Sequence, residues 1–138
     1  MTAKQIQRLP LQNLSLDDYR IDGVDRVMTP ALAIYPEIVD TNIKTTIELF
    51  GDNSDRWRPH VKTAKLGFIM RRMVEFGIRN FKCSTSLELL TACENGALDV
   101  AVAYPLIGAG ARRVREIADQ FPLTTFSALV ENQRHIEP

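Results

Sequence analysis

The feature that most limits the fold of this chain is an alternation of short apolar runs with helix-patterned segments, repeated at intervals of about 20 to 27 residues. The expected strands cover residues 31–35, 58–62, 80–84, 100–104 and 123–130. A strand, a helix and a second strand in succession form a right-handed unit in which the two strands are parallel. The sequence therefore predicts an α/β fold built on a parallel sheet.

The helices expected between these strands carry their own start and stop signals. Pro36 suits a first helical turn, and apolar residues follow it at helical spacing. Thr85 and Glu88 form a capping box, in which Thr85 accepts from the backbone and Glu88 reaches back to the cap. Gly77 and Gly96 are expected to end the second and third helices. These signals support the strand and helix boundaries.

Two architectures fit this pattern. One is a small doubly wound domain, and the other is the first half of a TIM-type (β/α)₈ barrel, a fold that takes about 250 residues. We predict parallel (β/α) units forming such a half barrel at residues 29–138, preceded by a leader at residues 1–28. Half a barrel leaves an open parallel edge, so it needs further sequence, a partner or a second copy.

Composition excludes several classes of partner. The chain is 45% hydrophobic and 25% charged, and its 17 Lys and Arg balance its 17 Asp and Glu. It therefore gives no reason to expect nucleic acid or a membrane surface as partner. The N-terminus lacks the apolar core of a signal peptide, and no run approaches the roughly 18 apolar residues of a membrane span. We expect a cytoplasmic protein in which Cys83 and Cys93 are reduced structural thiols.

Residues 58–65 (RPHVKTAK) place four basic side chains just before an apolar helical stretch. On a strand, Arg58, His60 and Lys62 would share one face, because side chains alternate with period two. The faces of a parallel strand are normally buried and apolar, so such a row breaks a packing rule and indicates function. The alternative is a basic loop in solvent.

Lys62 is the residue in this segment best placed for chemistry. It ends an expected parallel strand, where α/β folds place their active sites. A lysine attacks an aldehyde when it is unprotonated, and neighbouring cations such as Arg58 and His60 favour that form. The same two residues can bind anionic groups of an aldehyde cofactor. Lys65, expected at a helix start, is the weaker candidate.

Three further residues are expected at the same end of the strands. Ser84 and Thr85 offer hydroxyls and helix-terminal amides to a cofactor, although helix capping alone also accounts for Thr85. Tyr104 alternates with two valines of its strand. Its ring therefore either packs in the core or presents its hydroxyl at the mouth of a site.

Residues 29–32 (TPAL), 58–63 (RPHVKT) and 103–105 (AYP), in this order, resemble the D-threonine aldolase and D-serine dehydratase family of alanine-racemase-like barrel enzymes. The resemblance implies that Lys62 binds pyridoxal 5'-phosphate as a Schiff base. The residues expected near it from the strand pattern are then the candidate cofactor contacts, namely His60, Arg58, Tyr104, Ser84 and Thr85. The family pattern commonly continues as Lys-Thr-His-Lys, whereas this chain has Ala64 in place of that His. The departure leaves the particular reaction open.

The resemblance implies a lyase of D-amino-acid metabolism that cleaves or dehydrates a β-hydroxy D-amino acid, with Lys62 also serving as a general base at Cα. It further implies a homodimer, and a divalent metal in the full-length protein whose ligands lie outside these residues. An amino-acid racemase is the nearest alternative. A non-catalytic pyridoxal-phosphate carrier and a plain interaction module with a solvated basic segment are alternatives from other classes.

Overall fold

The computed structural model of the chain describes residues 16–135, which fall into two units divided between Tyr35 and Pro36. The first unit contains short 3-10 turns at Leu16–Tyr19 and Val24–Arg26. Within it, the Tyr35 hydroxyl donates to the Tyr19 carbonyl oxygen at 2.7 Å, and the two rings meet edge to face. Most of the predicted leader, residues 1–15, lies outside the described part of the chain.

The strand predicted at residues 31–35 is wrong, because this stretch has no strand hydrogen bonds within the described residues. Its side chains are largely exposed, and Leu32 is 73% exposed. An apolar run becomes a strand only when a neighbouring backbone completes its hydrogen bonds. The first unit supplies no such neighbour to these residues in its described part.

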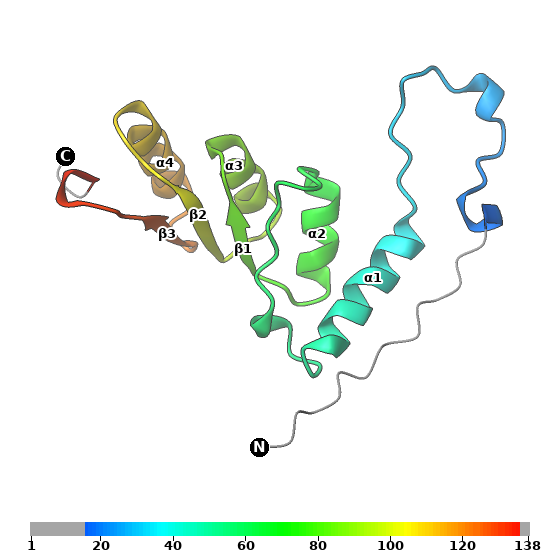
Figure 1. The fold of residues 1–138 in the computed structure, drawn as a ribbon, viewed down its shortest axis with the longest axis horizontal. Coiled ribbons are helices and arrows are strands. Elements are labelled where there is room, and N and C mark those ends of the chain that lie inside the picture. Colours follow the sequence, from blue (N-terminus) through cyan, green and yellow to red (C-terminus); the bar gives the residue numbers. More distant parts are fainter. Residues whose placement is uncertain (1–15, 136–138) are drawn as a thin grey trace. The chain divides into compact units, whose positions relative to one another are not determined.

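From residue 67 onward the second unit alternates helices and strands as the sequence predicted. Its helices and strands are α1 (Pro36–Leu49), α2 (Gly67–Glu75), β1 (Asn80–Cys83), α3 (Ser86–Glu94), β2 (Asp99–Pro105), α4 (Ala109–Gln120) and β3 (Thr125–Leu129). The three strands are parallel and lie in the order β1, β2, β3 (Figure 1). The α/β class and the parallel sheet are therefore confirmed. No helix in the described part of the chain is both long and apolar enough to cross a membrane.

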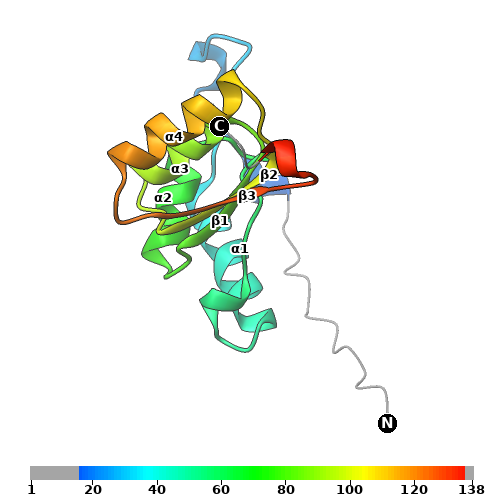
Figure 2. The ribbon, with the colours of Figure 1, turned by 90° about the vertical axis from the view of Figure 1, so that its left-hand side faces the viewer.

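One face of this sheet is covered by helices and forms the core. Helices α2, α3 and α4 lie on that face (Figure 2). Phe81 and Val100 are fully buried beneath them, while Lys82, between two buried residues of β1, is exposed on the opposite face. The core consists of Ile43, Val61, Met70, Ile78, Phe81, Cys83, Leu89, Ala92, Cys93, Ala97, Val100, Val102 and Ile117. The pattern follows from the two-residue period of a strand.

The helix signals read from the sequence are present. Thr85 Oγ1 accepts from the Glu88 N–H at 3.1 Å, which confirms the predicted cap of α3. The Glu88 carboxylate, however, accepts from the Ser84 N–H rather than from that of Thr85, at 2.8 Å. Gly77 and Gly96 follow α2 and α3 with φ of 90° and 95°. That region favours glycine, which has no Cβ to clash, so both residues suit the ends of helices.

The strand predicted at residues 58–62 is only partly formed. His60 makes a single parallel bridge to Lys82: the Val61 N–H donates to the Lys82 carbonyl, and the Lys82 N–H to the Pro59 carbonyl, both at 2.9 Å. Residues 61–64 then form a turn, closed by a 2.8 Å hydrogen bond from the Lys65 N–H to the Val61 carbonyl. The prediction of a strand that includes Lys62 is therefore wrong, because the turn begins at Val61.

Candidate functional site

The candidate site lies at the carboxyl end of β1, where the ring of His60 joins two segments. His60 Nε2 is 3.1 Å from Ser84 Oγ, and His60 Nδ1 accepts from the backbone N–H of Lys62 at 3.3 Å. A neutral imidazole has one donor and one acceptor nitrogen, so Nε2–H donates to the Ser84 hydroxyl. The ring thereby ties the backbone of Lys62 to the residue that follows β1.

Electrostatics favour this uncharged form of the ring. Burial lowers the pKa of His60 first, and the positive charges of Lys62 and Lys82 lower it further, while Glu88 opposes them. Burial and nearby cations both penalise the imidazolium ion. The pKa direction and the hydrogen-bond geometry therefore agree that His60 is neutral near physiological pH.

Lys62 itself has an exposed side chain at the start of the 61–64 turn. Within residues 16–135, no ion pair involves its amine. The turn follows the only part of the 58–62 segment that pairs with β1, so the lysine lies beside the carboxyl end of the sheet. This is the edge where parallel α/β folds bind ligands.

Glu88 and Lys65 contribute contacts that sequence reasoning missed. Glu88 is 4% exposed; one carboxylate oxygen accepts from the Ser84 N–H and the other lies 3.7 Å from Lys65 Nζ. Lys65 precedes α2 rather than starting it, and its φ is 56°. The capping box identified Glu88 as a polar residue at a helix start, but its burial and its second partner depend on the fold.

Arg58 lies at the other end of the strands. Its guanidinium donates to both carboxylate oxygens of Asp99, at 2.9 and 2.5 Å, and to the Phe81 carbonyl at 3.1 Å. Asp99 is the first residue of β2, and hydrogen bonding to Arg58 holds its pKa below the usual range. The structure thus brings together His60, Lys62 and Ser84, and separates Arg58 from them.

Thr85 and Tyr104 also lie at the carboxyl ends of strands. The Thr85 side chain is engaged in a helix cap, whereas the Tyr104 side chain is exposed. Thr85 Oγ1 already caps α3, and the Glu88 carboxylate sits at the same helix terminus. A second anion at this terminus would meet a negative charge already in place. Tyr104 is 62% exposed, which excludes core packing within the described chain and leaves its hydroxyl accessible.

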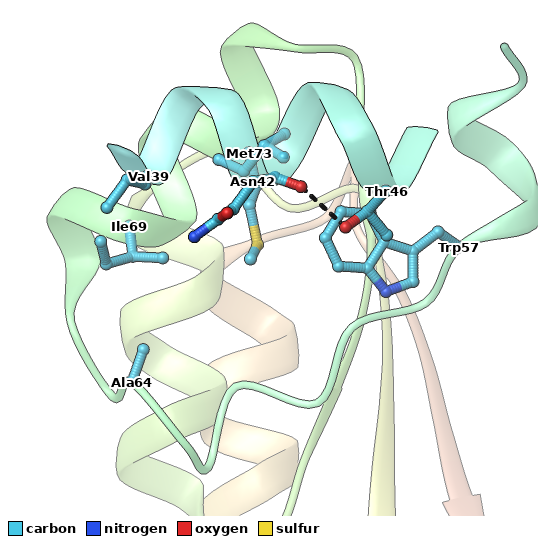
Figure 3. Close-up of a pocket in the computed structure, with 8 residues that line it drawn as sticks. Val39, Asn42, Thr46, Trp57, Ala64, Ile69 and Met73 are labelled. Carbon is cyan, nitrogen blue, oxygen red and sulfur yellow. Dashed lines mark hydrogen bonds between the residues drawn. The ribbon is translucent and has the colours of Figure 1, made fainter. Parts of the chain in front are cut away.

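Two cavities adjoin the segment that carries these residues. The larger, about 330 Å³, lies between α1, α2 and the segment after α1 (Figure 3), and is lined by Val39, Asn42, Ile43, Thr46, Trp57, Ala64, Ile69 and Met73. The smaller, about 20 Å³, is lined in part by His60 and Thr63. It is large enough for a water molecule only. Lys62 lines neither cavity.

The two cysteines take no part in the site. Burial raises the pKa of Cys83 to about 12 and that of Cys93 to about 11, so both remain unreactive thiols. The described residues contain no cluster that could hold a metal ion. Compared with known protein families and with curated proteins, the chain matches none.

Proposed function

We propose that this chain is the lysine-bearing part of a pyridoxal-phosphate-dependent enzyme that cleaves or dehydrates a β-hydroxy D-amino acid. The observation that carries the proposal is the position of Lys62: its side chain is exposed and free of ion pairs within the described residues, beside the carboxyl edge of a parallel sheet. The three sequence segments that resemble the D-threonine aldolase and D-serine dehydratase family also support Lys62 as the cofactor-binding lysine.

The residues beside Lys62 fit the aldehyde end of this cofactor. Lys62 Nζ would hold the aldehyde, and the neutral ring of His60 and the Ser84 hydroxyl are the polar groups next to its loop. The bound cofactor supplies an electron sink for breaking a bond to the amino-acid Cα. The N-terminus of α3 is unsuited to the phosphate group, because the Glu88 carboxylate already accepts from the Ser84 N–H there.

The chain's own residues have separate tasks in this proposal. Lys62 moves a proton at Cα as a general base. His60 fixes the backbone of Lys62 through Nδ1, and it adds no charge beside the amine because it is neutral. Ser84 orients the ring by accepting from Nε2. The half-barrel architecture, a homodimer and a cytoplasmic location belong to the same proposal.

The Ser84–His60 contact does not make a competing serine nucleophile. A serine is activated when a histidine nitrogen accepts its proton. Here the acceptor nitrogen is already engaged with the Lys62 N–H, so the nitrogen facing Ser84 is the protonated one. Ser84 therefore orients the ring and does not attack a substrate.

The proposal is tested by trapping the cofactor. The chain is mixed with pyridoxal 5'-phosphate, reduced with borohydride, and digested for peptide mapping. Lys62→Ala removes the candidate, while Lys44→Ala and Lys82→Ala remove exposed lysines that lie outside the 61–64 turn. We expect the adduct on Lys62 and its loss only in Lys62→Ala. Equal labelling of the three lysines, or none at Lys62, would overturn the proposal.

A second measurement separates the possible activities. Unreduced mixtures of the protein and the cofactor are assayed with β-hydroxy D-amino acids, with their L-enantiomers, and with D-alanine, which has no hydroxyl to eliminate. Aldehyde or ammonia release from the first group alone supports the lyase. Interconversion of enantiomers instead supports a racemase, and labelling without turnover in the full-length protein supports a cofactor carrier.

A further inference from the structure

Glu88 is the only charged side chain that is buried in the described part of the chain. Burying a carboxylate costs free energy unless hydrogen bonds or an opposite charge compensate. Its partners therefore indicate what the carboxylate is used for. Both of its oxygens contact residues connected to the 61–64 turn, which carries Lys62.

One carboxylate oxygen reaches the start of that turn through a chain of three hydrogen bonds. Glu88 Oε2 accepts from the Ser84 N–H at 2.8 Å, and Ser84 Oγ lies 3.1 Å from His60 Nε2. His60 Nδ1 then accepts from the Lys62 N–H at 3.3 Å. A displacement of Ser84 would therefore move the ring that holds the backbone of Lys62.

The other oxygen reaches the end of the turn. Glu88 Oε1 lies 3.7 Å from Lys65 Nζ, and the Lys65 N–H closes the turn by donating to the Val61 carbonyl at 2.8 Å. Lys65 has φ of 56°, a conformation that disfavours side chains with a Cβ. The side chain of the residue that closes the turn is thus paired with Glu88.

We propose that Glu88 is a positioning residue for Lys62, because its carboxylate fixes both ends of the turn that presents the lysine amine. Glu88 acts through Ser84, His60 and Lys65 and does not itself contact a ligand. The importance of the positioned amine rests on the proposed function, whereas the fixing of the turn can be measured without any cofactor.

Hydrogen exchange of the full chain without cofactor tests the positioning. Glu88→Ala removes both contacts, Glu88→Gln keeps an oxygen for the Ser84 N–H but loses the charge opposite Lys65, and Glu94→Ala changes an exposed glutamate of the same helix. We expect the Lys65 amide to exchange roughly tenfold faster in Glu88→Ala, with Glu88→Gln intermediate and Glu94→Ala unchanged.

The amide of Ile78, a fully buried residue, donates to the Met73 carbonyl at 3.0 Å and serves as the reporter of global opening. Faster exchange at Lys65 with Ile78 unchanged supports the proposal. An unchanged Lys65 amide, or equal acceleration of both amides, overturns it, because Glu88 would then either do nothing for the turn or stabilise the whole fold.

Borohydride trapping with pyridoxal 5'-phosphate adds a chemical readout. The ratio of adduct on Lys62 to adduct on the exposed Lys44 of α1 corrects for differences in protein and reagent concentration, and the exchange experiment shows whether the folded fraction has changed. We expect this ratio to fall roughly tenfold in Glu88→Ala and to recover in part in Glu88→Gln. An unchanged ratio overturns the positioning of the amine. Absence of adduct on Lys62 in the unaltered chain overturns the proposed function instead, and the exchange experiment still decides the role of Glu88.

Discussion

The two ends of β1 use polar residues from the same short segment in different ways. At the amino end, the Arg58 guanidinium is engaged by both oxygens of Asp99 and by a strand carbonyl. At the carboxyl end, His60 is neutral and the Lys62 amine has no ion pair within the described residues. Parallel α/β folds bind ligands at the carboxyl ends of their strands. We therefore expect Arg58 to contribute to stability, and the chemical role proposed for Lys62 belongs to the opposite end of β1.

Replacing Phe81 should have the largest effect on stability, because its side chain anchors β1, the strand whose two ends are compared. The side chain is fully buried in β1. We expect Phe81→Ala to lower the free energy of unfolding by roughly 3–5 kcal/mol, since it leaves a cavity in the core. Chemical denaturation measures the loss. Phe68→Ala, on an exposed position of α2, is the control and should change little; equal losses would contradict this account.

Asp99→Asn should affect the amino end alone. It removes the charge opposite Arg58, and both side chains are about one third exposed. Solvent therefore weakens the pair, and we expect a loss of about 1 kcal/mol in unfolding free energy. Trapping at Lys62 should be unchanged. A matched control is Asp119→Asn, which breaks an exposed pair within α4. A loss of Lys62 labelling in Asp99→Asn would remove the distinction between the two ends.

Ser84→Ala should affect the carboxyl end alone. It deletes the hydroxyl that accepts from His60, and we expect about 1 kcal/mol of lost stability with slower trapping at Lys62. Ser127→Ala on the exposed face of β3 serves as the control. If both variants trap the cofactor at the unaltered rate, the His60 ring is not oriented by Ser84.

The contribution of Asp99 should disappear in acid. Its pKa is lowered in the folded state by the Arg58 hydrogen bond, so the folded state binds fewer protons than the unfolded one. The stability it provides is therefore present above the unfolded pKa, about 4, and is lost as pH falls through the lower folded value. The difference in unfolding free energy between the unaltered chain and Asp99→Asn should shrink below about pH 4. If the difference in unfolding free energy stayed constant down to acid pH, the charge of Asp99 would not contribute to the stability.

The smallest expected effect is a change in the titration of His60. Because burial, Lys62 and Lys82 all lower its pKa, NMR titration should place His60 below an ordinary histidine. Lys82→Met removes a cation and should raise the pKa, while Lys44→Met on α1 should leave it unchanged. A His60 pKa at or above the ordinary value would contradict the neutral ring and the orientation argument built on it.

The success of sequence reasoning differed along the chain. Helix α3 and strand β2 lie close to their predicted positions, because caps, glycines and apolar periods act over a few residues. Residues 31–35 and 58–62 were predicted as strands, and the first is irregular while the second makes one bridge. Pairing of an extended segment depends on a neighbour that local patterns do not specify.

The sequence by itself determined the α/β class, the cap at Thr85 and the choice of Lys62 as the residue to test. Only the tertiary structure separated Arg58 from His60, because the Arg58–Asp99 contact joins residues 41 apart in sequence. It also buried Glu88 between Ser84 and Lys65, whose segments meet only when the chain folds. Local signals fix the backbone of single elements, whereas charge pairing and burial depend on which elements become neighbours in space.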